Sequence, residues 1–122
     1  MTETVLIAGA SGIVGSAAAA VMREAGWTVL GLARSPSAQK GVTPVVADLQ
    51  DPESLRAALA PHRPTRLVLS TWMRRPTEAE MIRVNGAMVR NLLDALRPAG
   101  TLRHAALVTG LKHYLGPFEA YG

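Results

Sequence analysis

The chain has 122 residues, of which 48% are hydrophobic and 18% charged, so we expect one hydrophobic core and a single domain over residues 1–122 rather than disorder. Its formal net charge is +4, but the thirteen basic residues are scattered rather than gathered into one stripe, which argues against nucleic acid as a partner. There is no cysteine, and His62, His104 and His113 lack ligand spacing, so neither a disulfide framework nor a metal site is expected.

The first residues run directly into a strand pattern. Met1-Thr2-Glu3 lacks the basic start and long apolar run of a signal peptide, and the longest apolar runs are far below the roughly 20 residues of a membrane-spanning helix. We therefore expect a cytoplasmic protein without a membrane partner. Thr4–Ala8 is short, apolar and rich in β-branched residues, and it stops at a glycine, which predicts a buried strand.

The following segments alternate between helix and strand patterns. Ile13–Ala25 is rich in alanine and stops at Gly26, which predicts a helix. Thr28–Ala33 and Thr43–Ala47 again have the apolar, β-branched character of strands. The apolar residues at helical spacing in the predicted helix are Ile13, Val14, Ala17, Val21 and Met22.

Capping signals mark two further helices. Asp51 is a typical N-cap residue, and the proline after it suits the first position of a short helix. Thr77 and Glu80 form a T-x-x-E capping box that opens a long amphipathic helix through Leu96. Apolar positions of these two helices include Leu55, Leu59, Ile82, Met88, Leu92 and Leu96.

Strand patterns at Leu67–Ser70 and Ala105–Thr109 complete the alternation, which implies right-handed crossovers and a parallel sheet. The predicted fold is α/β, a Rossmann-type doubly wound parallel sheet with strand order 3-2-1-4-5. Because a complete dinucleotide fold usually has a sixth strand, we expect a sheet truncated after the fifth, with Ala105–Thr109 as its edge. Such an edge, and an uncovered apolar face on the long helix, would favour association with another chain, for example as a homodimer.

A glycine-rich turn lies between the first predicted strand and the first predicted helix, where backbone N–H groups and the helix dipole can bind a pyrophosphate. Gly9 allows the turn, Gly12 lets the backbone approach the phosphate, and Gly15 lets the helix pack close to the strand. The spacing GxxGxxG is a variant of the GxGxxG fingerprint, and its context favours dinucleotide binding over a purely structural turn. The predicted cofactor contacts here are Gly9, Ser11, Gly12, Ile13, Val14 and Gly15.

The end of the second predicted strand decides between NAD and NADPH. An NAD enzyme places an acidic residue about 20 residues beyond the glycines to bind the ribose hydroxyls. This chain has Arg34 and Ser35 there instead. A guanidinium offers a planar fork of donors to a 2′-phosphate, and a serine hydroxyl can add another hydrogen bond. The sequence therefore favours NADPH, the alternative being that Arg34 is a solvated loop residue.

Residues at the ends of the third and fourth predicted strands reach the same sheet edge, where the ligand of such a fold lies. Asp48 and Leu49 follow the third strand, and the carboxylate suits either the adenine amino group or a turn. Ser70, Thr71 and Trp72 end the fourth strand, and Trp72 suits a core position equally well. We include all five among the predicted cofactor contacts.

From the glycine turn to its C-terminus the chain resembles the short-chain dehydrogenases of extended type. The matching features are the GxxGxxG turn, Asp48-Leu49, and Val84-Asn85 followed by Asn91-Leu92-Leu93. A more specific match is the tail, which is similar to the signature of the progesterone 5β-reductase and iridoid synthase group. It reads Thr109-Gly110-Leu111-Lys112-His113-Tyr114-Leu115-Gly116-Pro117-Phe118-Glu119.

This resemblance implies NADPH-dependent reduction of the C=C bond of an enone, with hydride delivered to the β-carbon and negative charge developing on the carbonyl oxygen. It places the catalytic lysine on Lys112, which would hold the nicotinamide ribose and support a tyrosine hydroxyl at that oxygen. It gives Asn85 a structural and proton-relay role, with a satisfied polar core residue as the alternative. Asn85 and Thr109 complete the predicted cofactor contacts.

The tyrosine of this group lies well downstream of the signature, and we expect this chain to lack it. Tyr114 and Tyr121 do not form the usual Y-x-x-x-K pair with Lys112, so neither is assigned as the acid. We interpret the chain as the cofactor half of a reductase that acts on a small enone or carbonyl substrate. The alternatives are an epimerase, dehydratase or carbonyl reductase of the same fold, and a non-catalytic NADPH-binding module.

Overall fold

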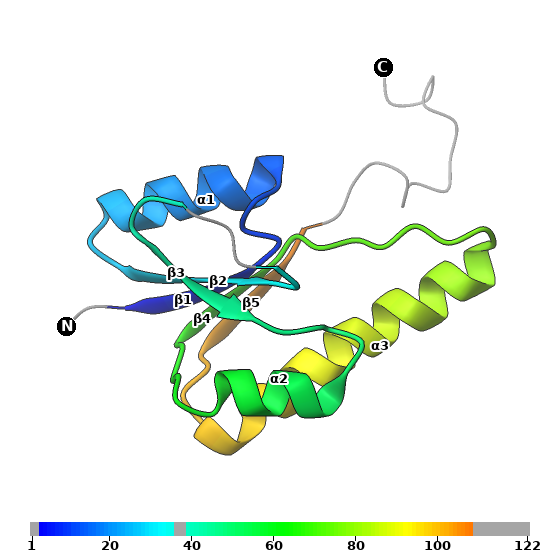
Figure 1. Ribbon diagram of the computed structural model, residues 1–122. Coiled ribbons are helices and arrows are strands. Elements are labelled where there is room, and N and C mark those ends of the chain that lie inside the picture. The colour runs from blue at the N-terminus through cyan, green and yellow to red at the C-terminus, as the bar shows by residue number, and fades with distance from the viewer. Residues whose placement is uncertain (1–2, 36–38, 109–122) are drawn as a thin grey trace.

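Five parallel strands form one sheet in the computed structural model, which describes residues 3–35 and 39–108 (Figure 1). Their order across the sheet is β3-β2-β1-β4-β5, so the predicted Rossmann-type fold is confirmed. The first two strands have the predicted bounds, and each of the other three begins one residue earlier than predicted. The strands are β1 (Thr4–Ala8), β2 (Thr28–Ala33), β3 (Val42–Val46), β4 (Arg66–Leu69) and β5 (His104–Leu107).

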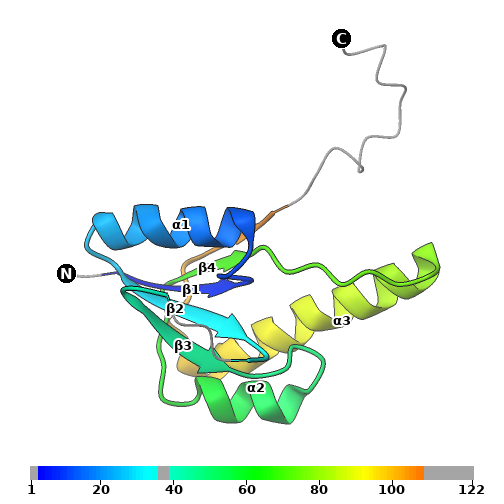
Figure 2. The ribbon, with the colours of Figure 1, turned by 45° about the horizontal axis from the view of Figure 1, so that its top comes forward.

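Helices cover both faces of this sheet. Helix α1 (Ile13–Glu24) lies on one face, and α2 (Pro52–Leu59) and α3 (Glu78–Leu96) lie on the other, as Figures 1 and 2 show. A short 3₁₀ helix, η1 (Arg97–Ala99), follows α3. Alternate residues of a strand point to opposite faces, so a central strand covered on both sides is apolar throughout. This explains why the last four residues of β1 are all buried.

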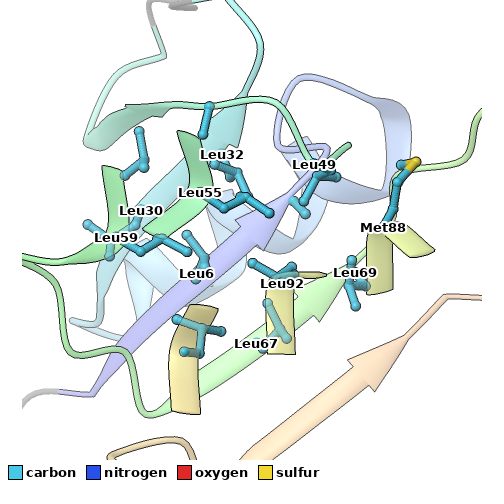
Figure 3. Packing of buried hydrophobic residues seen from close by; sticks show 14 of the residues in the cluster. Leu6, Leu30, Leu32, Leu49, Leu55, Leu59, Leu67, Leu69, Met88 and Leu92 are labelled. Carbon is cyan, nitrogen blue, oxygen red and sulfur yellow. The ribbon is translucent and has the colours of Figure 1, made fainter. Parts of the chain in front are cut away.

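The larger apolar cluster fills the space between the sheet and helices α2 and α3 (Figure 3). Leu6 of β1 pairs with Leu30 of β2 on one side and with Leu67 of β4 on the other, which places three leucines in a row across the sheet. Leu55 of α2 and Leu92 of α3 are fully buried against this cluster. Burying side chains of this size contributes about 1.5 to 3 kcal/mol each.

Helix α1 packs on the other face through its small residues. Gly15 and Ala19 are buried, and Ala18 and Met22 pack against the cluster that contains Val5 and Ile7 of β1. The apolar residues predicted at helical spacing therefore do not mark the packing face, since Met22 is the one member of that set that packs there. The members of that set that are exposed are Ile13, Val14, Ala17 and Val21.

Both predicted N-cap side chains on the opposite face cap their helices, and of the capping box at α3 the structure shows the Thr77 half. The Asp51 side chain accepts hydrogen bonds from two backbone N–H groups at the start of α2, and Thr77 Oγ1 accepts one from Glu80 N at 3.2 Å. The apolar positions predicted for α2 and α3 are buried, with one exception. Ile82 is 67% exposed, because it lies two residues, or about 200° of helix rotation, from the buried Val84. None of the helices in residues 3–35 and 39–108 combines the length and the apolar character that crossing a bilayer requires.

Strand β5 forms one edge of the sheet, as predicted. It pairs with β4, and all four of its residues are exposed. Leu107 is 60% exposed, and Val108 directly after the strand is 40% exposed. Association through this edge stays a prediction.

A hydrogen-bonded cluster lies at the amino ends of β1, β4 and β5. Thr65 Oγ1 donates to Glu3 Oε2 at 2.6 Å, and Arg66 Nη2 lies 3.0 Å from Glu3 Oε1. Arg66 also contacts His104 and lies over the Trp27 ring, 5.9 Å from its centroid. The Thr65 hydroxyl, and after it the Arg66 guanidinium, hold the pKa of the Glu3 carboxyl below its usual value.

Candidate functional site

A cavity of about 330 Å³ opens at the carboxyl ends of β1, β2, β3 and β4. Its lining consists of Gly9, the segments 32–34, 47–50 and 71–74, and Met88 of α3. In doubly wound sheets the ligand lies at this edge, beside the point where the strand order reverses. That point is β1 here, because the chain leaves β1 toward β2 on one side and returns to β4 on the other.

The glycine turn between β1 and α1 is closed by contacts that leave no room for side chains at two of its three glycines. Gly9 has φ +87°, and a Cβ there would lie 2.8 Å from Ser70 Oγ. A Cβ on Gly15 would collide with the carbonyl group of Gly9. A Cβ on Gly12 would lie 3.4 Å from Gly9 O, an ordinary contact. Gly9 and Gly15 are therefore required by the turn itself, and Gly12 is not.

The first turn of α1 presents its backbone N–H groups outward. Gly12 is the N-cap, its backbone is extended, and no side chain caps the helix. Ser16 N donates to Gly12 O at 2.9 Å, so the N–H groups of the three residues before Ser16 have no acceptor within the helix. The first turn contains no acidic residue that would compete with an anion. Ser11, Ile13 and Val14 are exposed here, beside the cavity but outside its lining.

Ser70 and Thr71 support the glycine turn from β4. Ser70 Oγ donates to Ala8 O at 2.8 Å, which joins the ends of β1 and β4 behind Gly9. Thr71 lines the cavity, and its Oγ1 lies near the space that a Gly9 side chain would occupy. The structure thus gives Ser70 a bracing position and places Thr71 at the cavity surface.

Arg34 and Asp48 come to the cavity from neighbouring strands, β2 and β3. Arg34 is exposed and lines the cavity, whereas Ser35 is exposed and lies outside the lining. Asp48 is half-buried, and its Oδ1 accepts a hydrogen bond from Gln50 N at 2.9 Å, so the turn role considered for it is present. Asp48 also lines the cavity, as Leu49 does.

The opposite wall contains Trp72, which was predicted as a contact, together with Met73 and Arg74, which were not. Trp72, which is 61% exposed, lines the cavity rather than entering the core, and it is followed there by Met73 and Arg74. Gln50 comes from the other wall, and its Nε2 donates to Met73 Sδ at 3.1 Å. Residues 70–72 were predicted because they follow the fourth strand, and Met73 and Arg74 are the next two residues along the chain.

Asn85 lies behind this wall and is 7% exposed. Its side chain bonds both backbone groups of Met73 at 2.9 Å and also donates to Met81 O at 2.8 Å. The structure therefore shows it as a satisfied polar core residue. Lys112 and Thr109, with the rest of the tail signature, lie outside the described residues.

The electrostatic character of the lining suits an anionic ligand. Arg34 and Arg74 contribute two positive charges, Asp48 contributes one negative charge, and the remaining lining is apolar or neutral. Open backbone donors at a helix N-terminus together with guanidinium groups form a phosphate-binding combination. Within the residues that the structure describes, no cluster of three or more histidine or carboxylate side chains could hold a metal ion.

A model of the NAD dependent epimerase/dehydratase family matches residues 5–115. Among curated proteins, the chain is 41% identical over 128 residues to an (S)-8-oxocitronellyl enol synthase of Camptotheca acuminata, a match that covers 96% of this chain and 33% of the relative. It is 40% identical over 124 residues to 3-oxo-Δ(4,5)-steroid 5β-reductase of Arabidopsis thaliana, covering 93% and 32%. The resemblance inferred from the tail signature is therefore confirmed. The chain spans about a third of the length of these relatives.

Solved structures show the same architecture. A short-chain dehydrogenase/reductase superfamily protein of Agrobacterium tumefaciens with bound NAD is 29% identical, with a TM-score of 0.72 over 90% of this chain and 33% of that one. The UDP-glucose 4-epimerase of Thermus thermophilus, in complex with NAD, is 25% identical, with a TM-score of 0.70 over 83% and 36%. The fold and the family's use of a nicotinamide dinucleotide agree with the site geometry.

Proposed function

Because the chain belongs to the NAD-dependent epimerase/dehydratase family, we propose that it forms the cofactor-binding part of an NADPH-dependent reductase that reduces the C=C bond of an enone. The position of Arg34 is the observation on which the choice of cofactor depends. This residue lines the cavity directly after β2, where an NAD-binding Rossmann domain has an acidic residue for the ribose hydroxyls. A guanidinium there favours a 2′-phosphate through paired, charge-assisted hydrogen bonds.

The pyrophosphate of the cofactor would lie against the first turn of α1. The unpaired N–H groups at that turn supply donors, and the absence of a side chain at Gly12 keeps the approach open. Exposed Ser11 would add a hydroxyl beside the phosphates. Ile13 and Val14 contribute through their backbone positions at the helix start.

The adenosine part would occupy the cavity between segments 47–50 and 71–74. Asp48 uses Oδ1 in its turn, so Oδ2 is the oxygen that would accept a hydrogen bond from the adenine amino group. Leu49, Met73 and Met88 supply apolar surface for the base. With the pyrophosphate at the first turn of α1, the nicotinamide end would extend away from this cavity, beyond the glycine turn.

When bound, NADPH supplies the hydride that the β-carbon of the enone accepts. The tail signature assigns Lys112 to the nicotinamide ribose and to support of the group that stabilises the developing oxyanion. The curated relatives named as a 3-oxo-Δ(4,5)-steroid 5β-reductase and as an (S)-8-oxocitronellyl enol synthase support this assignment of reaction class. The described residues bind and orient the cofactor.

The proposal is tested by product analysis with the full protein. With NADPH and a simple cyclic enone, we expect NADPH consumption together with formation of the saturated ketone in equal amount. NADH should support a much lower rate at the same concentration. Formation of the allylic alcohol, or no reaction with a range of enones, would overturn the assignment to C=C reduction.

A second candidate is an epimerase or dehydratase of the same family. The family model that matches residues 5–115 and the likeness to a UDP-glucose 4-epimerase favour it. Arg34 favours NADPH, so binding of NADPH by the protein would argue against this candidate. Incubation with a sugar nucleotide and NAD, followed by chromatography of the sugar products, separates the two candidates, and a carbonyl reductase is recognised by alcohol formation.

A further inference from the structure

Two asparagine side chains of α3 reach out of the helix to the two opposite walls of the cavity. They are Asn85 and Asn91, six residues apart. In an α-helix this separation corresponds to about 9 Å along the axis and about 120° around it, so the two amides point in different directions. Met88, midway between them, lines the cavity itself, and Figure 3 shows it beside Leu49.

Asn85 fixes the wall that follows β4. Its Oδ1 accepts from Met73 N, and its Nδ2 donates to Met73 O, each at 2.9 Å. Both backbone groups of one residue are thus held by one planar amide. Met73 lies between Trp72 and Arg74, which line the same cavity. A shift of Met73 would therefore displace the whole segment 71–74.

Asn91 fixes the wall that follows β3. Its Nδ2 donates to Leu49 O at 3.0 Å, a contact between residues 42 positions apart in the sequence. Leu49 is buried and lies between Asp48 and Gln50, which line the cavity with it. The two walls also touch each other, because Gln50 Nε2 donates to Met73 Sδ. One helix therefore holds both walls and supplies the floor between them.

We propose that Asn85 and Asn91 are positioning residues of the nucleotide site, which set the separation of segments 47–50 and 71–74 without contacting the nucleotide. Neither asparagine belongs to the described residues that line the cavity. This inference rests on the proposed function, since it assigns the space between the two segments to the adenosine part of the cofactor. The effect of each asparagine should then be the same for NADPH and NADH, because the two walls enclose the part that both cofactors share.

The experiment compares three variants of the full protein. Asn91→Ala removes the donor to Leu49 O, and Asn85→Asp keeps the acceptor for Met73 N while removing both Nδ2 donors. Ile82→Ala is the matched control, because Ile82 is on the same helix and 67% exposed. Calorimetry gives the Kd of NADPH, NADH and adenosine 2′,5′-bisphosphate, and thermal unfolding gives the Tm of each variant.

We expect Asn91→Ala to raise the Kd of all three ligands by the same factor, about tenfold for the loss of one wall anchor. Asn85→Asp should do likewise, and Ile82→Ala should leave every Kd unchanged. Unchanged Kd values in Asn91→Ala with a lowered Tm would overturn the inference, since the amide would then serve stability alone. If Asn85→Asp does not fold, Asn91→Ala decides by itself. If the wild-type protein binds none of the three ligands, the proposed function is overturned. If the wild-type protein binds them and the variants bind equally well, only the present inference is overturned.

Discussion

The two ends of the parallel sheet use polar groups in opposite ways. At the amino ends of β1 and β4, the side chains of Glu3, Thr65 and Arg66 bond to one another. At the carboxyl ends, the turn from β1 to α1 contains glycines, and the donors of the first turn of α1 point outward without a side-chain cap. At one end the side chains bond mainly to one another, although the buried Nε of Arg66 has no partner, and at the other end backbone donors are available to a ligand.

Stability and binding are thus separated between the two ends of a small α/β unit. Groups that bond to each other at the amino end stabilise the sheet and have little left to offer a ligand. At the carboxyl end, the Ser70 hydroxyl donates to Ala8 O, and the side-chain amides of Asn85 and Asn91 bond to the cavity walls. These bonds hold the segments in place and leave their cavity-facing surfaces free. Substitutions at the two ends should therefore differ in kind as well as in size.

The largest expected effect comes from Gly15→Ala. The new Cβ would collide with the Gly9 carbonyl group, and a backbone neighbour cannot rotate away as a flexible side chain can. Helix α1 would have to move off the sheet, at a cost of about 3 kcal/mol or more, the upper range for overpacking. Urea unfolding should show this loss without any ligand present. Stability equal to wild type would mean that α1 does not approach β1 as closely as described.

Gly12→Val should remove cofactor binding while the fold is retained. Its Cβ is free of backbone collision, so the structural cost is limited to about 1 kcal/mol for a β-branched residue at an N-cap. The side chain would stand where the pyrophosphate meets the helix N-terminus, and we expect the affinity for both NADPH and NADH to fall below detection. Ala17→Val adds the same side chain to the exposed face of α1 as a control. Retained affinity with an unchanged circular dichroism spectrum would place the nucleotide elsewhere.

Arg34→Ala should weaken NADPH binding by about 1 to 3 kcal/mol, the range for hydrogen bonds to a charged group, and leave NADH binding nearly unchanged. Titration of both cofactors into the variant measures the difference. Arg90→Ala, an exposed arginine of α3, removes the same charge away from the cavity and controls for general electrostatic attraction. Equal losses for the two cofactors in Arg34→Ala would remove the 2′-phosphate role.

The fold could be predicted from the sequence because its determinants are local. Apolar β-branched runs gave the strands, and Asp51 and Thr77 marked two helix starts through side chains that bond their own helix. The buried face of α1 was not predictable in this way. Its contact with the sheet depends on how closely Gly15 lets the backbones approach, which is a property of two segments together.

The candidate site was predictable where it follows strand ends and not where it depends on long-range contacts. Gly9, Arg34, Asp48, Leu49, Thr71 and Trp72 were selected and line the cavity. Met73 enters the lining through bonds with Asn85 and Gln50, which lie 12 and 23 residues away in the sequence. No local pattern contains that information. The side chain of Asn85 was likewise interpretable only once its partner segment was known.

The smallest expected effect lies at the amino end of the sheet. The Thr65 hydroxyl, followed by Arg66, lowers the pKa of Glu3, so the ionised carboxylate is favoured in the folded state. A lowered folded-state pKa contributes stability above the unfolded value, near 4.5, which is lost as the pH falls through the folded value. Glu3→Gln keeps an oxygen for Thr65 but removes the charge, so its Tm should be slightly below wild type at pH 7, and the difference should vanish in acid.

Asp94→Asn provides the matched control for this test. Asp94 pairs with Arg97 at 2.8 Å, but both side chains are largely exposed, and a pair of this kind contributes little to stability. Its substitution should not lower the Tm at either pH, because the charge of Asp94 near the carboxyl end of α3 also opposes the helix dipole. If Glu3→Gln behaved like Asp94→Asn, the cluster at the amino end would hold no net stabilising charge interaction. The two ends of the sheet would then differ only in which groups they offer to a ligand.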